Sequence, residues 1–539
     1  MVNHGRSNGC LTCKRRRVKC DEARPNCHSC QRLGLHCGGY KAKPTTFKFK
    51  DQSHKFGTEV VPKKACPSPR PLAEPDTSVP FFLQHYAVMG RDMQSASGFF
   101  ELLVPVYSSQ PQKSALSLAV SAIASEVISL WRHDSFGAPQ KAYLQAVKCL
   151  RSTIQDPSER GKPATVLAVL SLQFYENLAA IYDRRPASRV HHDGAISLLP
   201  FAKSDFTNRL VSGYLRKYIF HSEMSSAIRQ NRPLQSIVRS SFTESNDSTT
   251  EPANPSFLLD SIGASVAELQ ASYFQRANHD DPMLSKQHDH RDWRTEAQHI
   301  DEQLLAWARS VPEYWRPRKL TSGQDIEPLI PTYESVCEVY PSCQIGTIWN
   351  LWRVQRLLLI KIILSSDEIS ARDEDFVSCK QALQELVDSV CHSVPFYLGN
   401  QAGPLSLADF ADPAVFLPID LLPPDDVLGS GNESNWNEHR SHIIAQGPWH
   451  ILSPLSRVVT FFLEDHGPLM KTFLRPGQYE WIREQFLRVT ILLRIPLVDT
   501  DNADEVSHQF NSSVQGSVDT RVENLARKVR KSAVFMSGP

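Results

Sequence analysis

The stretch Cys10-Leu-Thr-Cys13-Lys-Arg-Arg-Arg-Val-Lys-Cys20 decides the fold of the amino-terminal part of the chain, together with Cys27-His-Ser-Cys30-Gln-Arg-Leu-Gly-Leu-His-Cys37, which follows after six residues. Both segments have the spacing C-x2-C-x6-C. Cysteines in a C-x2-C pair are a zinc-ligand signature, because the short loop lets both sulfurs face one ion. The third cysteine lies seven positions after the second, close to two turns of an α-helix, so a helix is expected to direct both sulfurs to the same side.

The number of cysteines limits how metal can be held. Two separate tetrahedral zinc ions need eight ligand bonds, and the segment has six cysteines. Two ions are accommodated if two thiolates are shared between them. The alternative is to recruit His4, His28 or His36, none of which has a repeated spacing. Sharing is the simpler interpretation, and the basic residues nearby would offset the negative charge of such a cluster.

The two segments differ in charge. Five of the six residues between Cys13 and Cys20 are basic, whereas Arg32 is the only charged residue between Cys30 and Cys37. A dense positive surface on a short helix suits contacts with phosphates and base edges. The candidate DNA-contact residues are Lys14, Arg15, Arg16, Arg17 and Lys19. The second segment is expected to be a packing partner, with Gly34 at a helix end.

The segment from Gly9 to Tyr40 resembles the fungal binuclear zinc cluster transcription factors, in which six cysteines hold two zinc ions. The likeness rests on the cysteine spacing, on the basic run, and on Lys19, Asp21, Pro25, Gly39 and Tyr40. The metal ligands are then Cys10, Cys13, Cys20, Cys27, Cys30 and Cys37. The resemblance also implies that Cys10 and Cys27 bridge the two ions.

The resemblance further implies how DNA is read. The short helix after Cys13 would enter the major groove. The residues that match the family's base-reading positions are Arg16 and Arg17, with Lys14 and Lys19 on phosphates. Family members typically read CGG triplets, and bidentate binding of arginine to guanine O6 and N7 is a sound physical basis for that preference.

Two other interpretations fit six cysteines. A disulfide framework belongs to secreted chains, but the amino terminus has no signal-peptide core, and clustered cations are no part of such a framework. A zinc module that binds protein instead of DNA is the alternative function. The position of the basic run inside the metal framework favours DNA.

Charge is divided unevenly along the 539 residues. Residues 1–50 hold 12 Lys and Arg against two Asp and Glu, a balance of +10, and the remainder holds 47 against 56, a balance of −9. This asymmetry indicates that only the amino-terminal part meets nucleic acid. The most apolar run, 357–364, is interrupted by Lys361 and is too short to span a membrane, so no membrane partner is expected. Zinc thiolates need a reducing intracellular setting, and the basic runs 14–19 and 41–64 fit nuclear import signals.

Three regions are predicted. They are a binuclear zinc cluster DNA-binding domain over residues 1–40, a flexible basic and proline-rich linker over residues 41–78, and a large all-α regulatory domain over residues 79–539. No sustained apolar heptad follows the cluster, so the protein either binds DNA as a monomer or forms a homodimer through its large domain. The other cysteines show no repeated pairing and are expected to be reduced thiols: Cys66, Cys149, Cys337, Cys343, Cys379 and Cys391.

The large domain has helical periodicity. One amphipathic helix is predicted by the spacing of Leu116, Val120, Ile123, Val127 and Leu130. Another is expected to begin near Pro139, and residues 166–172 form a buried-looking run. No alternation of period two is apparent, so the sequence predicts a mainly α protein with few strands.

Three stretches of the large domain are similar to the fungal-specific regulatory domain that accompanies this zinc cluster. They are Phe82-Leu-Gln-His-Tyr86, His192-Asp-Gly-Ala-Ile-Ser-Leu-Leu199 and Trp349-Asn-Leu-Trp-Arg-Val-Gln-Arg-Leu-Leu-Leu-Ile360. The resemblance implies a helical regulatory domain that transmits signals or contacts partners such as the transcription machinery.

Three polar segments interrupt the helical pattern. Residues 238–256 and 422–440 are rich in Ser, Asn, Pro or Gly and are predicted to be disordered loops. The acidic residues between Asp499 and Glu505 are interpreted as a solvated loop, with an acidic activating segment as the alternative.

Enzyme signals are weak. His191 and His192 are adjacent, so they point to different faces of a helix, and His192 is expected to pack in the core. His288 and His290 lie in a polar stretch without a third ligand at helical spacing. No G-x-S-x-G, P-loop or dinucleotide glycine fingerprint occurs, and an enzyme is not expected. The prediction is a nuclear, zinc-dependent, sequence-specific regulator of RNA polymerase II transcription, and the resemblance points to metabolic or secondary-metabolite genes.

Overall fold

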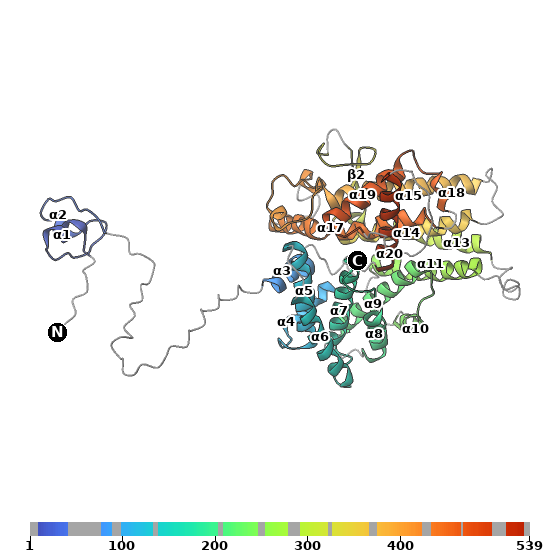
Figure 1. Cartoon of the computed structure of the whole chain (residues 1–539), viewed down its shortest axis with the longest axis horizontal. Helices are drawn as coiled ribbons and strands as arrows, with labels where there is room; N and C mark the ends of the chain where they lie inside the picture. Colours follow the sequence, from blue (N-terminus) through green and yellow to red (C-terminus); the bar gives the residue numbers. More distant parts are fainter. Residues whose placement is uncertain are drawn as a thin grey trace. The chain divides into compact units, whose positions relative to one another are not determined.

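The computed structural model describes residues 9–40, 77–88, 99–132, 138–202, 209–245, 254–278, 292–321, 326–365, 374–422, 433–464, 467–497 and 514–532. The chain divides into two compact units, residues 1–74 and residues 75–539 (Figure 1). The amino-terminal unit contains two short helices, α1 (Leu11–Arg16) and α2 (His28–Gln31). Of the predicted linker 41–78, residues 41–76 lie outside the described residues.

The second unit is built from helices. Its first half contains α3 (Ser78–Phe82), η2 (Leu83–Val88), α4 (Phe100–Ser108), α5 (Ala115–Arg132), α6 (Ala138–Gln155), α7 (Pro163–Ile181), α8 (Val190–Leu198), η3 (Leu199–Phe201), α9 (Arg209–Gln230), α10 (Ser236–Ser245) and α11 (Pro255–Asn278). Its second half contains α13 (Trp293–Ser310), η4 (Glu313–Trp315), β1 (Arg318–Thr321), β2 (Val336–Val339), α14 (Cys343–Leu364), α15 (Glu374–Leu398), η5 (Leu407–Phe410), η6 (Pro418–Leu421), α17 (Glu433–Phe461), α18 (Gly467–Lys471), α19 (Gln478–Leu492) and α20 (Val514–Ser532).

The mainly α prediction is confirmed. The helices expected around Leu116 and Pro139 are α5 and α6, and the buried-looking run lies within α7. Within the described part of the chain the sheet consists of β1 and β2, which pair antiparallel with Leu320 opposite Cys337. The stretches that resemble a regulatory domain lie on α3 and η2, on α8 and η3, and on α14.

Helix α20 joins the two halves of the second unit. In Figure 1 it is drawn in dark red and runs from among the orange elements toward the green ones. It packs against α17 and also against α7. The Lys528 Nζ atom donates to the Ile181 carbonyl at 3.1 Å, and Tyr182 donates to the Leu493 carbonyl at 2.5 Å. The halves therefore share one apolar core.

Two core helices satisfy the length and composition of a membrane span. Helices α5 and α7 do so, and 72% and 89% of their most apolar 18-residue stretches are buried inside the unit. Both are longer than residues 357–364, the run expected to be the most apolar, so that expectation missed these two runs. Their burial is that of core helices in a globular protein, which pass the same test.

A buried ion pair connects β2 to α14. The guanidinium of Arg353 is bonded to the Glu338 carboxylate, and its Nη1 atom donates to the Tyr340 hydroxyl oxygen at 2.9 Å and to the Asn350 amide oxygen at 2.8 Å. Tyr340 in turn donates to Glu338 at 2.7 Å. Arg353 is 2% exposed and Glu338 is 1% exposed, so both charged groups are buried away from solvent.

Two segments predicted to be loops are partly helical. Residues 238–245 belong to α10, and residues 433–440 begin α17, while residues 246–253 and 423–432 lie outside the described residues. Tertiary contacts stabilise both segments: Val238 is buried, and Arg440 donates to the Val415 carbonyl at 2.5 Å. Packing overrides weak local propensity here.

Candidate metal centre and nucleic-acid interface

The six cysteines of the amino-terminal unit converge into two groups of four sulfurs. One group contains Cys10, Cys13, Cys20 and Cys27, and the other contains Cys10, Cys27, Cys30 and Cys37, with all Sγ atoms of a group within 4.8 Å of one another. The Sγ atoms of Cys10 and Cys27 belong to both groups and lie 3.7 Å apart. Two tetrahedral ions need eight ligand positions, and six sulfurs fill all eight when two of the sulfurs bind both ions.

The distances between sulfurs fit a metal cluster and exclude disulfides. The Cys13 Sγ atom lies 3.7 Å from the Cys27 Sγ atom in one group, and the Cys10 Sγ atom lies 3.8 Å from the Cys30 Sγ atom in the other. A disulfide requires about 2.05 Å. Around a tetrahedral zinc ion with zinc–sulfur distances of about 2.3 Å, neighbouring sulfurs lie about 3.8 Å apart. The residues present therefore fit zinc in both donor number and spacing.

The two halves of the cluster repeat one local fold. The N-cap residues of α1 and α2 are Cys10 and Cys27, whose Sγ atoms accept from the backbone N–H groups of Cys13 at 3.3 Å and Cys30 at 3.4 Å. Each helix is followed by a left-handed residue, Arg17 with φ 54° and Gly34 with φ 60°. Both turns carry the six-to-one bond of a helix end, from the Val18 N–H to the Cys13 carbonyl at 3.1 Å and from the Leu35 N–H to the Cys30 carbonyl at 3.0 Å.

This geometry corrects one expectation. The helices begin before Cys13 and Cys30, and they end at Arg16 and Gln31. Cys20 and Cys37 therefore do not lie two helical turns further along, as the seven-residue spacing had suggested. They reach the cluster because the left-handed turn sends the chain back toward the helix start. Gly34 does mark the end of its helix, as predicted, and Arg17 takes the same conformation at the matching position.

Side chains outside the cysteines fasten the two halves together. The Thr12 hydroxyl donates to the His36 carbonyl at 2.9 Å and accepts from the Gly38 N–H at 2.9 Å. The Tyr40 hydroxyl donates to the Ala23 carbonyl at 2.7 Å. Thr12 lies within the C-x2-C loop, and spacing alone did not reveal its role.

Asp21 organises the start of α2. Its carboxylate accepts from the backbone N–H groups of His28 at 3.0 Å and Ser29 at 3.2 Å. The bond from the His28 N–H is the largest cause that holds the pKa of Asp21 well below its usual range. Asp21 therefore stays ionised and neutralises part of the positive helix end.

The pKa values of the thiols depend on their neighbours. The backbone N–H of Cys10, 3.4 Å from the sulfur, lowers the pKa of Cys20 to about 7. Burial, with the thiols packed around it, raises the pKa of Cys13 to about 12, and burial likewise raises the pKa of Cys27. Because metal binds thiolates, zinc must displace the protons that this packing retains.

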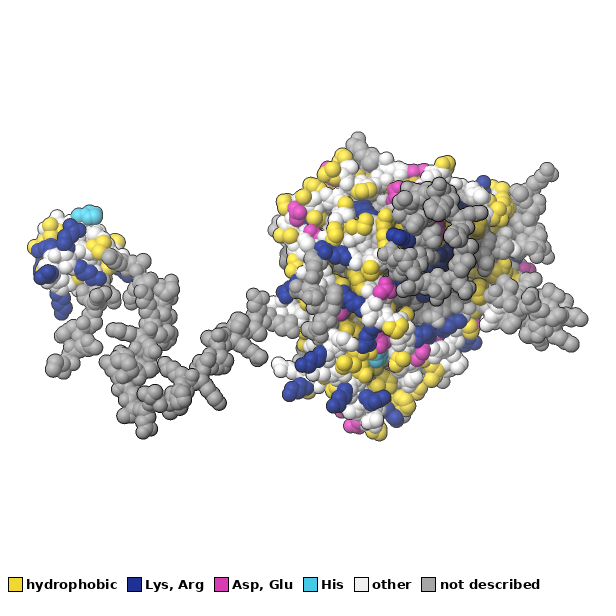
Figure 2. Space-filling view, viewed as in Figure 1, with side chains coloured by type: hydrophobic (Ala, Val, Ile, Leu, Met, Phe, Trp, Pro, Cys, Tyr) yellow, Lys and Arg dark blue, Asp and Glu magenta, His cyan; other side chains and the backbone are white. Residues whose placement is uncertain are grey.

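The five candidate DNA-contact residues form an exposed basic surface. Lys14, Arg15 and Arg16 lie in the last turn of α1, and Arg17 and Lys19 follow in the turn that leads to Cys20. All five are exposed, and within residues 9–40 none forms an ion pair. Lys and Arg side chains cover much of the face of this unit drawn in Figure 2, whereas the drawn face of the second unit mixes both charges with apolar side chains. This basic surface is available to an external polyanion.

The described part of the amino-terminal unit, residues 9–40, has almost no apolar core. The buried residues between 9 and 40 are Gly9, Cys10, Cys13, Cys27 and Cys30. Its larger apolar side chains are exposed, including Leu33 at 52% and Val18 at 43%. With so little buried apolar surface, metal–thiolate bonds must supply the folding free energy.

The histidines of the second unit that were considered for catalysis have separate partners. The His192 Nε2 atom lies 2.8 Å from a Glu223 carboxylate oxygen, and the His191 Nε2 atom lies 3.5 Å from Glu176. His192 is buried, as predicted. His288 and His290 lie outside the described residues.

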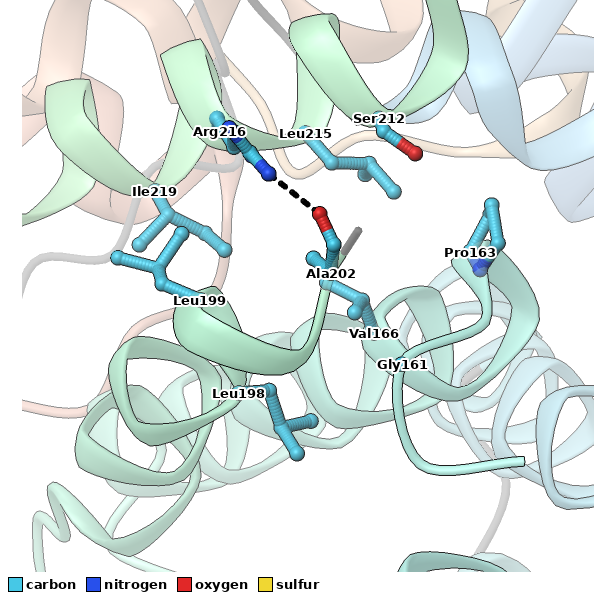
Figure 3. A pocket seen from close by; sticks show the side chains of 10 residues that line it. All are labelled: Gly161, Pro163, Val166, Leu198, Leu199, Ala202, Ser212, Leu215, Arg216 and Ile219. Atoms are coloured by element: carbon cyan, nitrogen blue, oxygen red, sulfur yellow. Dashed lines mark hydrogen bonds between the residues drawn. The ribbon is translucent and has the colours of Figure 1, made fainter. Parts of the chain in front are cut away.

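One internal gap lies between α7, α8 with η3, and α9 (Figure 3). Its volume is about 10 Å³, and Arg216 spans it to donate to the Ala202 carbonyl. A volume of about 10–15 Å³ is needed for a single water molecule, so this gap cannot hold a substrate.

Comparisons with known proteins agree with the geometry of the amino-terminal unit. Residues 8–46 match the fungal Zn(2)-Cys(6) binuclear cluster domain. The aspercryptin biosynthesis cluster-specific transcription regulator atnN of Emericella nidulans is 65% identical to this chain over 37 residues. The matched segment is 7% of this chain and 6% of that protein. The pestheic acid cluster transcriptional regulator 3 of Pestalotiopsis fici is 53% identical over 45 residues, 8% of each chain.

A longer match extends into the second unit. The transcription factor dbaG of Emericella nidulans is 22% identical over 346 residues, which are 62% of this chain and 77% of that protein. No solved structure matches the chain.

Proposed function

Since this chain is a fungal binuclear zinc cluster transcription factor whose amino-terminal domain takes two zinc ions, we propose that this domain reads a CGG-type sequence in the major groove of duplex DNA. The observation that carries the proposal is the exposed basic surface beside the metal centre. Because Arg16 and Arg17 lie at the end of α1 and in its left-handed turn, they are the residues assigned to base edges. Lys14, Arg15 and Lys19 are assigned to phosphates.

We propose the cysteines of the two sulfur groups as the metal ligands, and their convergence supports this assignment. Cys10 and Cys27 bridge both ions. Cys13 and Cys20 complete the coordination of one ion, and Cys30 and Cys37 complete that of the other. Zinc supplies the rigid link between the two halves, and the chain's own residues then hold α1 at a fixed angle to its partner through Thr12 and Tyr40.

The roles of the basic residues can be separated by substitution. R16A and R17A are each expected to weaken binding to a CGG duplex by about 1–3 kcal/mol and to relax base preference, because a bidentate contact with guanine is lost. K14A is expected to weaken binding to CGG and scrambled duplexes alike and to reduce the salt slope by about one. Titrations of the full chain at several salt concentrations measure both effects.

Arg32 provides the matched control. It occupies in the second half the place that Arg15 occupies in the first, it is exposed, and its surroundings are not basic. R32A should therefore leave the CGG preference unchanged. Equal losses on both duplexes for R16A, R17A and K14A would contradict the assigned roles. Binding without salt dependence, or no DNA binding, would favour the alternative function, a zinc module that contacts protein.

The second unit is assigned to regulation. We place the DNA-binding domain at residues 1–40, a linker at 41–78 and a helical regulatory domain at 79–539. The protein is proposed to act in the nucleus on RNA polymerase II genes, together with the transcription machinery, as a monomer or as a homodimer through the helical domain. The names of two relatives, atnN and the pestheic acid regulator, refer to gene clusters, which supports a pathway-specific role. Genome-wide mapping of bound sites tests motif, half-site spacing and pathway together.

A further inference from the structure

Three metal-binding side chains meet in the interior of the second unit. Cys343 is the first residue of α14, and His442 and His450 lie on α17. One donor atom from each lies within 4.8 Å of the other two, which is the same limit that holds for the sulfur groups of the amino-terminal unit. All three residues are 0% exposed. A thiolate with two imidazoles is a donor set that zinc uses in proteins.

The helices direct these side chains to one place. His442 and His450 are eight residues apart, so they share a face of α17 with Gln446, which lies between them. The Gln446 amide donates to the His85 carbonyl at 2.9 Å and to the Tyr86 carbonyl at 3.2 Å, so this face is fixed against η2. Helix α17 also packs very close to α15. A Cβ atom at Gly447 would lie only 2.2 Å from the Tyr397 carbonyl oxygen.

Thr347 sets the orientation and tautomer of one histidine. Its single hydroxyl proton is donated to the Cys343 carbonyl at 2.9 Å. The His450 Nδ1 atom, 2.7 Å from the same hydroxyl oxygen, must therefore be the donor in that contact. Neutral His450 then carries its lone pair on Nε2. Metal-binding histidines in proteins are commonly held in this way, by a bond from the nitrogen that does not bind the metal.

A fourth donor lies beside the three. Gln344 is 0% exposed, and its amide nitrogen Nε2 lies 3.5 Å from the His442 Nε2 atom. Turning the amide by 180° exchanges its nitrogen and oxygen and brings the oxygen to that place. Its carbonyl oxygen accepts no hydrogen bond from the residues that the structure describes. A buried carbonyl oxygen without a partner is destabilising, and a cation would satisfy it.

We propose that Cys343, His442 and His450, with the Gln344 amide oxygen as fourth donor, bind a zinc ion in the interior of the regulatory domain. This ion joins the start of α14 to the middle of α17, elements almost a hundred residues apart. Its role is structural, because all four side chains are buried and the donor set is complete without water. The whole chain then binds three zinc ions, two in its amino-terminal domain and one in its regulatory domain.

Counting zinc in variants of the full chain tests the proposal. In the C10A/C27A chain, which lacks both shared ligands of the amino-terminal cluster, one zinc ion per chain is expected to remain. Adding C343A or H450A to that background should remove it. C391A is the matched control, because Cys391 is an equally buried thiol on α15 outside the group. Elemental analysis with protein quantified by amino-acid analysis gives the count.

A milder variant avoids loss of a ligand. T347V keeps all four donors and removes the bond to His450 Nδ1, and about a 10–100-fold loss of zinc affinity is expected in competition with a chelator. No zinc in the C10A/C27A chain, with its far-UV circular dichroism retained, would overturn the proposal. So would equal zinc contents with and without C343A. Zinc in excess of one ion per C10A/C27A chain would instead count against the assignment of the amino-terminal ligands.

Discussion

C27S is expected to remove two zinc ions from the chain and to weaken specific DNA binding at least about a thousandfold, toward the non-specific level. The Cys27 sulfur belongs to both four-sulfur groups, so its replacement leaves each ion with three thiolates. It also caps α2 by accepting from the Cys30 N–H, and because a serine hydroxyl can accept the same bond, the effect of C27S falls on the metal ions. Since residues 9–40 bury little besides cysteine, no apolar core remains within them to keep their shape.

C37S is the matched comparison. The Cys37 sulfur belongs to one group only, so one ion should be lost while the other keeps four thiolates. Zinc content relative to the unaltered chain and titration on a CGG duplex at fixed salt measure the two effects. C149A, which alters a cysteine of α6 outside both groups, should change neither. Equal zinc losses from C27S and C37S would refute the sharing of Cys27.

E338Q is expected to destabilise the second unit by about 3–5 kcal/mol, because it leaves the buried Arg353 guanidinium without its counter-charge. Burial alone would lower the pKa of Arg353, but the Glu338 carboxylate outweighs it and raises that pKa above its ordinary value. Glutamine removes that carboxylate, but a guanidinium is not deprotonated in proteins, so Arg353 stays charged in the variant. Tyr340, whose pKa burial raises well above the usual value, remains neutral and cannot replace the carboxylate.

Thermal unfolding followed by far-UV circular dichroism measures this loss. E159Q is the control, because the pair between Glu159 and Lys162 lies at the surface, and exposed pairs contribute about 0–1 kcal/mol. The double variant E338Q/R353M should recover part of the stability, since it removes the uncompensated charge. An E338Q chain as stable as the unaltered one would contradict the importance of the pair.

The amino-terminal site was predictable from sequence because its chemistry is local. Spacing alone brought six sulfurs together and limited the ions to two, and the basic run placed the candidate contact surface beside them. The path of the chain was predicted less well. A left-handed residue at Arg17 could not be anticipated from a side chain that disfavours it, so Cys20 was placed on a helix that in fact ends at Arg16.

The helices of the second unit were predictable only where apolar residues recur along one face of the helix. The apolar spacing in α5 and α6 was sufficient, whereas the polar composition of α10 and of the start of α17 suggested loops. Those segments are held by contacts such as that of Arg440 with the Val415 carbonyl, which involve residues far away in sequence. The same reason hid the group of Cys343, His442 and His450. No spacing rule relates residues that tertiary packing brings together.

Helix α1 has six residues, a length of roughly 9 Å, which is about the rise of three base pairs. Three base pairs allow on the order of 64 different sequences, so any one of these sequences recurs by chance throughout a genome. One copy of this domain therefore carries too little information to single out a promoter. With the proposed three-base-pair readout, selection of a gene would need a second recognition sequence nearby, bound by another copy of the chain or by a different regulator.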